Sequence, residues 1–110
     1  MVTSNARLTD KQRVEKYLDY LEREWARVPQ IAAEWAGWDE DDRLEFQVEW
    51  GIRDDRLADL GRFTRIGLLL PDQEARFDRL QELIARNRPR LEHLFASCYP
   101  GAPQAGLLKA

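Results

Sequence analysis

The sequence predicts an all-α protein, an elongated three-helix up-down-up bundle whose first and third helices are kinked by proline. Apolar residues recur every three or four positions through residues 10–36 and 71–97, which is the spacing of one helix face. Between them, residues 39–66 open on the acidic run Asp39–Asp42, which is typical of a helix N-terminus. The connections between the three segments are short, so we expect neighbouring helices to be antiparallel.

The first helix is expected over residues 10–36. Thr9 is a good N-cap because Gln12, three residues on, can complete a capping box. Only Glu24 interrupts the apolar series, which comprises Val14, Tyr17, Leu21, Val28, Ile31, Trp35 and Trp38. Pro29 removes a backbone donor, but the series continues past it in register, which predicts a kink or short break. Gly37 is expected to end the helix.

The second helix, over residues 39–66, has conflicting local signals. Apolar and polar residues alternate through Leu44, Phe46, Val48, Trp50 and Ile52, which is the period of a half-buried strand. A strand here would need residues 63–70 as its partner, giving a helix–β-hairpin–helix fold as the alternative. The acidic start and the helical spacing of Leu57, Leu60 and Phe63 favour the helix. As a helix, the segment is apolar on two opposite sides, with Phe46 and Trp50 on one and Val48 and Ile52 on the other.

The third helix is expected over residues 71–97. Pro71 suits a first helical position, and Pro89 predicts a kink, with Asn87 placed to cap a restarted helix. The apolar series here comprises Phe77, Leu80, Ile84, Asn87, Leu91, Leu94 and Cys98. We therefore expect a single helical domain over residues 1–98, with a loose arm before Thr9 and a flexible C-terminal tail over residues 99–110.

Composition narrows the class of protein. The 110 residues are 34% charged and 44% hydrophobic with a net charge of −3, which is typical of one folded, acidic domain. No apolar run approaches the roughly 20 residues that span a bilayer, so we expect no membrane association. The N-terminus lacks the apolar core of a secretion signal, and the single cysteine excludes an internal disulfide, so we expect a cytoplasmic protein. Arginine outnumbers lysine 14 to 3, which suggests a GC-rich, bacterial genome.

The sequence offers no chemistry-bearing motif. His93 is the only histidine, which excludes sites that need two. His93 and Cys98 are five residues apart and would lie on different helix faces, which argues against a thiol–imidazole pair. The acidic segment shows neither a calcium-loop pattern nor convergent carboxylates for magnesium. We expect no catalytic residue, no cofactor and no metal, and hence no enzyme.

The charged segments indicate whether the protein is suited to bind nucleic acid. The arginine-rich stretch of the third helix is interleaved with acids at spacings that suit ion pairs within that helix; it comprises Arg76, Arg79, Arg86, Arg88 and Arg90. We therefore do not expect nucleic-acid binding. Residues 39–60 hold nine acids and three arginines, a net charge of −6, which would suit a basic partner or an imitation of a phosphate backbone.

The functional expectation follows from the unpartnered apolar surface. We expect a non-enzymatic helical protein–protein interaction module that self-associates, most simply as a homodimer, or docks on a partner protein. The expected contact residues are Phe46, Trp50, Leu68, Leu69 and Leu70. The alternative is a nucleic-acid-linked regulator, either antitoxin-like or an acidic DNA mimic.

Overall fold

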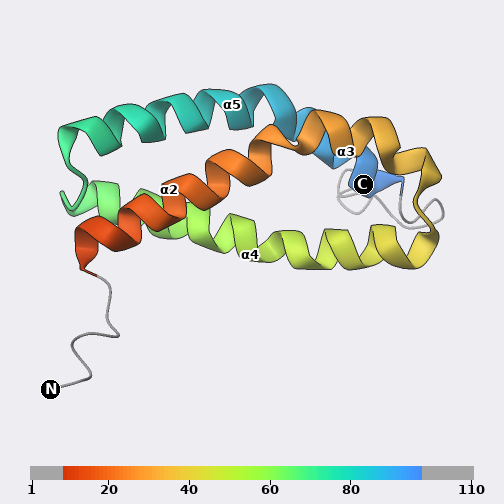
Figure 1. Cartoon of the computed structure of the whole chain (residues 1–110), viewed down its shortest axis with the longest axis horizontal. Coiled ribbons are helices and arrows are strands. Elements are labelled where there is room, and N and C mark those ends of the chain that lie inside the picture. Colours follow the sequence, from red (N-terminus) through yellow and green to blue (C-terminus); the bar gives the residue numbers. More distant parts are fainter. Residues whose placement is uncertain (1–8, 98–110) are drawn as a thin grey trace, which may run out of the picture.

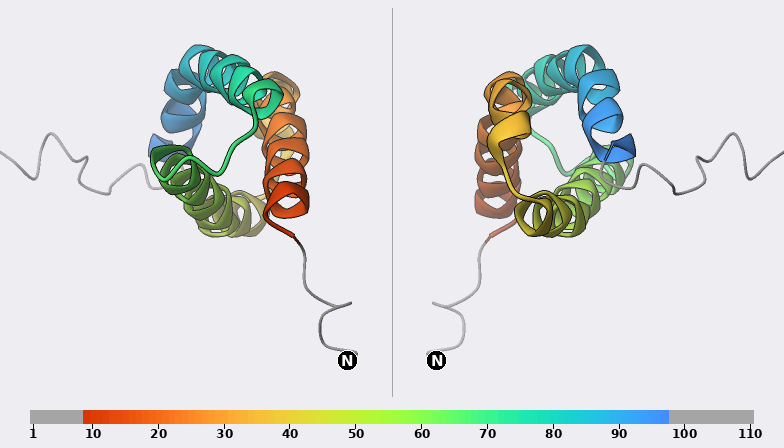
Figure 2. Two further views of the ribbon diagram at one scale, coloured as in Figure 1. Left: turned by 90° about the vertical axis from the view of Figure 1, so that its left-hand side faces the viewer. Right: turned by 90° about the vertical axis from the view of Figure 1, so that its right-hand side faces the viewer.

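The computed structural model describes residues 9–97, and this part of the chain is an elongated bundle measuring 52 × 30 × 27 Å. The element order is α2 (Asp10–Ala26), α3 (Val28–Glu34), the short 3-10 turn η1 (Trp35–Gly37), α4 (Glu40–Arg65) and α5 (Pro71–Ala96). Residues 9–97 contain no strand, so the predicted all-α fold is confirmed. The chain passes along the long axis three times in alternating directions (Figure 1). Seen end-on, the three passes lie around a common axis (Figure 2), and the buried side chains form one cluster.

The first pass begins at a complete capping box. Thr9 Oγ1 accepts from the N–H of Gln12 at 3.1 Å, and Gln12 Oε1 accepts from the N–H of Thr9 at 3.0 Å. The predicted kink is a short break at Arg27, which closes α2 and opens α3. Pro29 falls in the first turn of α3, where its missing donor costs no helical hydrogen bond. The N–H of Ile31 still bonds to the carbonyl of Arg27 at 2.9 Å, so the chain continues forward.

The second pass, α4, is a helix and not a strand. Asp39 Oδ1 accepts from the N–H of Asp42 at 2.8 Å, and three acids occupy the first turn, where the helix dipole favours negative charge. The alternating apolar residues face two sides because positions two apart on a helix point about 200° apart. Helix α4 ends in a Schellman motif, with Gly67 at φ 77 and the N–H of Leu68 bonded to the carbonyl of Phe63 at 2.9 Å.

The third pass, α5, opens with Pro71 at its first position. Leu70 has no side-chain acceptor, but its N–H donates to Gln73 Oε1 at 3.0 Å, which supplies half of a capping box. Pro89 lies inside the helix, and the last turns of α5 bend away from its earlier axis (blue in Figure 2). The predicted capping role of Asn87 is wrong. Its amide is buried and donates back to the carbonyl of Leu83 at 2.9 Å, so the helix runs through without restarting.

The core is rich in aromatic rings. Helix α2 packs against both α4 and α5, and α3 packs against α5. Trp25, Trp35 and Trp50 are buried and Trp38 is half-buried. The rings of Trp25 and Trp50 meet edge to face with centroids 5.0 Å apart, which joins α2 to α4 at the middle of the bundle.

Glu24, the one interruption of the first apolar series, forms a buried ion pair. Its carboxylate accepts from Arg53 Nη2 at 2.8 Å and from Arg27 Nη1 at 3.1 Å. The side chains of Glu24 and Arg53 are only 9% and 13% exposed. The Arg53 guanidinium also lies 5.1 Å from the ring centroid of Trp50 and 5.8 Å from that of Tyr20. The pair therefore fixes the register of α2 against α4.

A second charged cluster joins α2 to α5. Arg76 donates to Glu15 at 2.8 Å, to Asp19 at 2.7 Å and to Glu22 at 2.8 Å. These hydrogen bonds, chiefly those to Glu22 and Asp19, raise the pKa of Arg76 above its ordinary value. The buried amide of Gln73 also donates to Glu15 at 2.8 Å. Arg76 thus pairs across helices, not within α5 as the sequence spacing predicted.

Candidate interaction surface on helix α4

The predicted contact residues lie mostly inside the protein. Phe46, Trp50 and Leu69 are 8%, 2% and 7% exposed, and they pack within the core. Leu68 is half-buried in the turn between α4 and α5, and Leu70 is 41% exposed. Phe46, Trp50 and Leu69 cannot offer their side chains to another molecule while the bundle stays closed. The large rings of α4 turn inward, so these three predicted contact residues belong to the core.

The opposite side of α4 carries the exposed apolar residues. Val48 is 71% exposed and Ile52 is 51% exposed, one helical turn apart on the outer face of the bundle. Leu44, one turn before Val48, is half-buried on the same face. Single exposed apolar residues are common, but a row on the outer face of a helix is a feature of helix-docking surfaces.

A second stripe of α4 runs beside this row, along the seam with the first pass of the chain. It follows three- and four-residue spacing and comprises Asp42, Glu45, Glu49, Ile52 and Arg56. The first half of this stripe, from Asp42 to Glu49, is acidic, and the second half consists of Ile52 and the cation Arg56. The seam is hollowed at two places, one in each half of the stripe.

The first hollow, which we call the acidic notch, has a volume of about 270 Å³ and is lined by Trp38, Asp42, Glu45, Phe46 and Glu49. The ring of Trp38 meets that of Phe46 edge to face at 5.5 Å, which forms an apolar floor. Within residues 9–97, none of the three notch carboxylates takes part in an ion pair. The notch therefore combines an aromatic floor with uncompensated negative charge.

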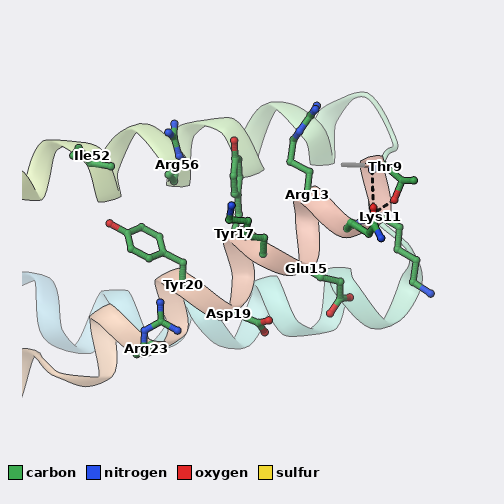
Figure 3. A pocket seen from close by; sticks show the side chains of 12 residues that line it. Thr9, Lys11, Arg13, Glu15, Tyr17, Asp19, Tyr20, Arg23, Ile52 and Arg56 are labelled. Carbon is green, nitrogen blue, oxygen red and sulfur yellow. Dashed lines mark hydrogen bonds between the residues drawn. The ribbon is translucent and has the colours of Figure 1, made fainter. Parts of the chain in front are cut away.

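The second hollow, which we call the basic groove, has a volume of about 950 Å³ and lies between α2 and the second half of α4 (Figure 3). Its lining comprises Thr9, Lys11, Gln12, Arg13, Glu15, Lys16, Tyr17, Asp19, Tyr20, Arg23, Ile52 and Arg56. Five of these residues are cations and two are acids. Both acids face α5 in Figure 3 and are bonded to Arg76, whereas Arg13 and Arg56 lie on the side toward α4.

Two tyrosines form the apolar wall of the basic groove. Tyr17 and Tyr20 point from α2 toward α4, and Tyr20 reaches toward Ile52 (Figure 3). Arg56 lies 5.3 Å from the ring centroid of Tyr17, and Arg23 lies 5.9 Å from that of Tyr20. Arg56 is also paired with Asp59 at 3.5 Å and Arg23 lies 3.9 Å from Glu24. Lys16 makes no ion pair within residues 9–97, so its charge is available to an anionic group on the open side. The groove can therefore hold an acidic side chain beside an apolar one.

The basic groove was not foreseen from the sequence. A weak signal for it exists, because Arg13, Lys16, Tyr20 and Arg23 are three or four positions apart and form one basic and aromatic face of α2. The opposing wall comes from α4, which α3 and η1 separate from α2 in the chain. No single-helix pattern could bring the two walls together.

Metal-binding groups and the pair of His93 and Cys98 were the chemical possibilities that the sequence raised. No group of three or more His, Cys, Asp or Glu side chains in that range is arranged to hold a metal ion. His93 is exposed on α5, and Cys98 lies outside the described residues, so their pairing is not tested. The proposed tail over residues 99–110 and the arm before Thr9 also lie outside that range. No helix in the described part of the chain is long and apolar enough to cross a membrane.

A scan against protein-family models, a search of the curated proteins and a search of the solved structures each found no match to this chain.

Proposed function

We propose that the chain is a non-enzymatic helical interaction module that associates with a second copy of itself through the outer face of α4. The observation that carries this proposal is the pair Val48 and Ile52, which are 71% and 51% exposed in the middle of a 26-residue helix. A surface helix of a monomer usually places polar residues there. The single cysteine supports a reducing compartment, and we propose a cytoplasmic location on that basis.

The size of the apolar row sets the strength of association. Full burial of a valine or isoleucine side chain contributes about 1.5–3 kcal/mol, so these partly exposed residues contribute about 1–2 kcal/mol each. Four such side chains from two copies supply about 4–8 kcal/mol, while association costs at least about 4 kcal/mol. The apolar row alone therefore supports only weak, concentration-dependent pairing, and polar groups around it must contribute.

The test is the mass of the protein in solution as a function of concentration, measured by sedimentation equilibrium. We expect the wild-type mass to rise toward twice that of the monomer. Val48→Glu and Ile52→Glu should keep the protein monomeric, because each would bury a charge at the centre of the interface.

A matched control is available in Ile66→Glu. Ile66 is 70% exposed, close to the value for Val48, but it lies five turns farther along, at the end of α4. This variant should associate as the wild type does, and far-ultraviolet circular dichroism should show unchanged helix content in all three variants. A wild-type protein that stays monomeric at every concentration would contradict the proposal, as would equal loss of association in the control.

A further inference from the structure

Charges of opposite sign lie in the two halves of the α4 seam. In the acidic notch, Asp42, Glu45 and Glu49 make no ion pair within residues 9–97. In the basic groove, Lys16 likewise makes none within that range, and the nearest carboxylate to Arg23 is Glu24 at 3.9 Å. Arg56, at the far end of the stripe, is paired with Asp59 at 3.5 Å. Both clusters lie on the same side of α4 and flank the exposed apolar row.

A two-fold axis perpendicular to α4 would superpose these opposite clusters. If the axis passes midway between Val48 and Ile52, at the level of residue 50, the two α4 helices are antiparallel and Val48 of each copy faces Ile52 of the other. Glu45 lies five residues before this level and Arg56 lies six residues after it. Reversal of the helix therefore brings Glu45 of one copy to within one residue of the level of Arg56 in the other.

The same rotation keeps the seam side of both helices together. A two-fold axis perpendicular to the helices and parallel to their interface reverses direction along the helix but does not exchange its two flanks. The notch of each copy thus meets the groove of the other, and the contact occurs twice. A parallel pairing about a two-fold axis along the helices would instead put the seam sides of the two copies on opposite flanks. Neither the notch nor the groove of one copy would then meet its oppositely charged counterpart in the other.

We propose that the basic groove between α2 and α4 is the receptor for the acidic notch of a second copy, which makes the dimer antiparallel and electrostatically self-complementary. The inference rests on the self-association proposed above and adds the partner surface and its orientation. Tyr17 and Tyr20 supply the apolar wall against which the notch residues pack. Lys16 and Arg23 lie one on each side of Tyr20 on α2, where they can meet Glu45 and Glu49.

Charge reversal on each side tests this arrangement. The notch variant carries Glu45→Lys and Glu49→Lys, and the groove variant carries Lys16→Glu and Arg23→Glu. All four residues are exposed, so the fold should be retained, and helix content by circular dichroism checks this. In either homodimer both contacts would join like charges, so we expect the dissociation constant to rise at least tenfold, which corresponds to about 1.4 kcal/mol.

Mixing the two variants provides the decisive result. In the mixed pair, the positive notch meets the negative groove and the unchanged notch meets the unchanged groove, so both contacts become attractive again. We expect the mixture to form a heterodimer with a dissociation constant within about threefold of the wild-type value. Raising sodium chloride from about 50 mM to about 500 mM should weaken the wild-type dimer, because salt screens exposed charges.

Each contrary outcome is distinguishable. If both charge variants associate like the wild type while Ile52→Glu is monomeric, self-association stands and the notch–groove contact is overturned. If the mixture fails to associate, the two clusters do not meet and the contact is likewise overturned. A monomeric wild type that binds a fluorescent single-stranded oligonucleotide or poly-glutamate peptide, and loses it in the groove variant, would overturn both proposals and assign the groove to that anion.

Discussion

The buried pair of Glu24 and Arg53 gives the sharpest prediction on stability. The substitution Glu24→Leu keeps the side chain close in size and restores the apolar series of α2, yet it should destabilise the protein. It removes the carboxylate that accepts hydrogen bonds from Arg53 at 2.8 Å and from Arg27 at 3.1 Å. Arg53, whose side chain is only 13% exposed, would then lack its counterion.

The magnitude follows from the burial of the pair. Removal of one partner of a buried ion pair costs about 3–5 kcal/mol. Arg53 would retain its contacts with the rings of Trp50 and Tyr20, at 5.1 and 5.8 Å, and some access to water. We therefore expect Glu24→Leu to lower the free energy of unfolding by about 3 kcal/mol, near the lower end of that range. For a protein whose total stability is on the order of 5–15 kcal/mol, this is a large loss.

Urea unfolding followed by tryptophan fluorescence measures this loss, because Trp25 and Trp50 lie in the core beside the pair. The control is the double variant Glu24→Leu with Arg53→Met, in which neither charge remains. Since a buried pair can be replaced by apolar residues at little cost, its stability should return to within about 1 kcal/mol of the wild-type value. A loss below about 1 kcal/mol in the single variant, or no recovery in the double variant, would refute the reasoning.

Four further substitutions test other parts of the fold by the same unfolding measurement. Gly67→Ala should lower the free energy of unfolding by about 1 kcal/mol, because the φ of Gly67 is 77. Gly51→Ala should raise it by about 0.5–1 kcal/mol, because Gly51 lies inside α4 with open space where a Cβ would be. The reverse order would contradict the helix end at Gly67. Gln47→Met should stabilise by about 1 kcal/mol, since Gln47 Oε1 is buried and has no hydrogen-bond partner within residues 9–97, and a loss would show that this oxygen is satisfied. Arg76→Met should cost about 1–2 kcal/mol, as expected for a network of partly exposed ion pairs. Hydrogen bonds to Glu22 and Asp19 raise the pKa of Arg76. The stability that Arg76 contributes is therefore complete below its unfolded-state pKa and is lost only above that pKa. The loss of stability in Arg76→Met should consequently be the same at about pH 7 and about pH 9.

Local signals in the sequence predicted the helix boundaries well. Thr9 with Gln12 and Asp39 with its acidic first turn are short-range capping patterns, and both helices begin where these patterns indicate. The outcome at Asn87 was different because its amide, placed to cap a new helix, instead bonds to the carbonyl of Leu83 one turn back. Helix and strand over residues 44–52 could not be separated by periodicity alone. The choice depends on how this segment packs against the first pass, as in the contact of Trp50 with Trp25. Such tertiary contacts are not contained in a local sequence pattern.

The two-sided apolar pattern of α4 was visible in the sequence, but its orientation was not. Phe46 and Trp50 turn inward because their rings pack against those of Trp35, Trp25 and the half-buried Phe95, and this burial outweighs that available to smaller side chains. Val48 and Ile52 are consequently left outside. A one-dimensional pattern assigns apolar residues to two sides but cannot tell which side the remaining helices cover.

The antiparallel pairing of two α4 helices is tested most directly by one distance. In a Cys98→Ser background, Ala58→Cys places a spin label on the exposed flank of α4, eight residues from the level of the proposed two-fold axis. With about 1.5 Å per residue and helix axes about 8–10 Å apart, the two labels should lie about 25 Å from each other in pulsed electron double resonance. A distance below about 15 Å would indicate parallel helices. In a parallel pair the two labels lie at the same level along the helices, so only the distance across the two helices separates them. That short distance, or the absence of dipolar coupling at concentrations where the mass doubles, would contradict the account.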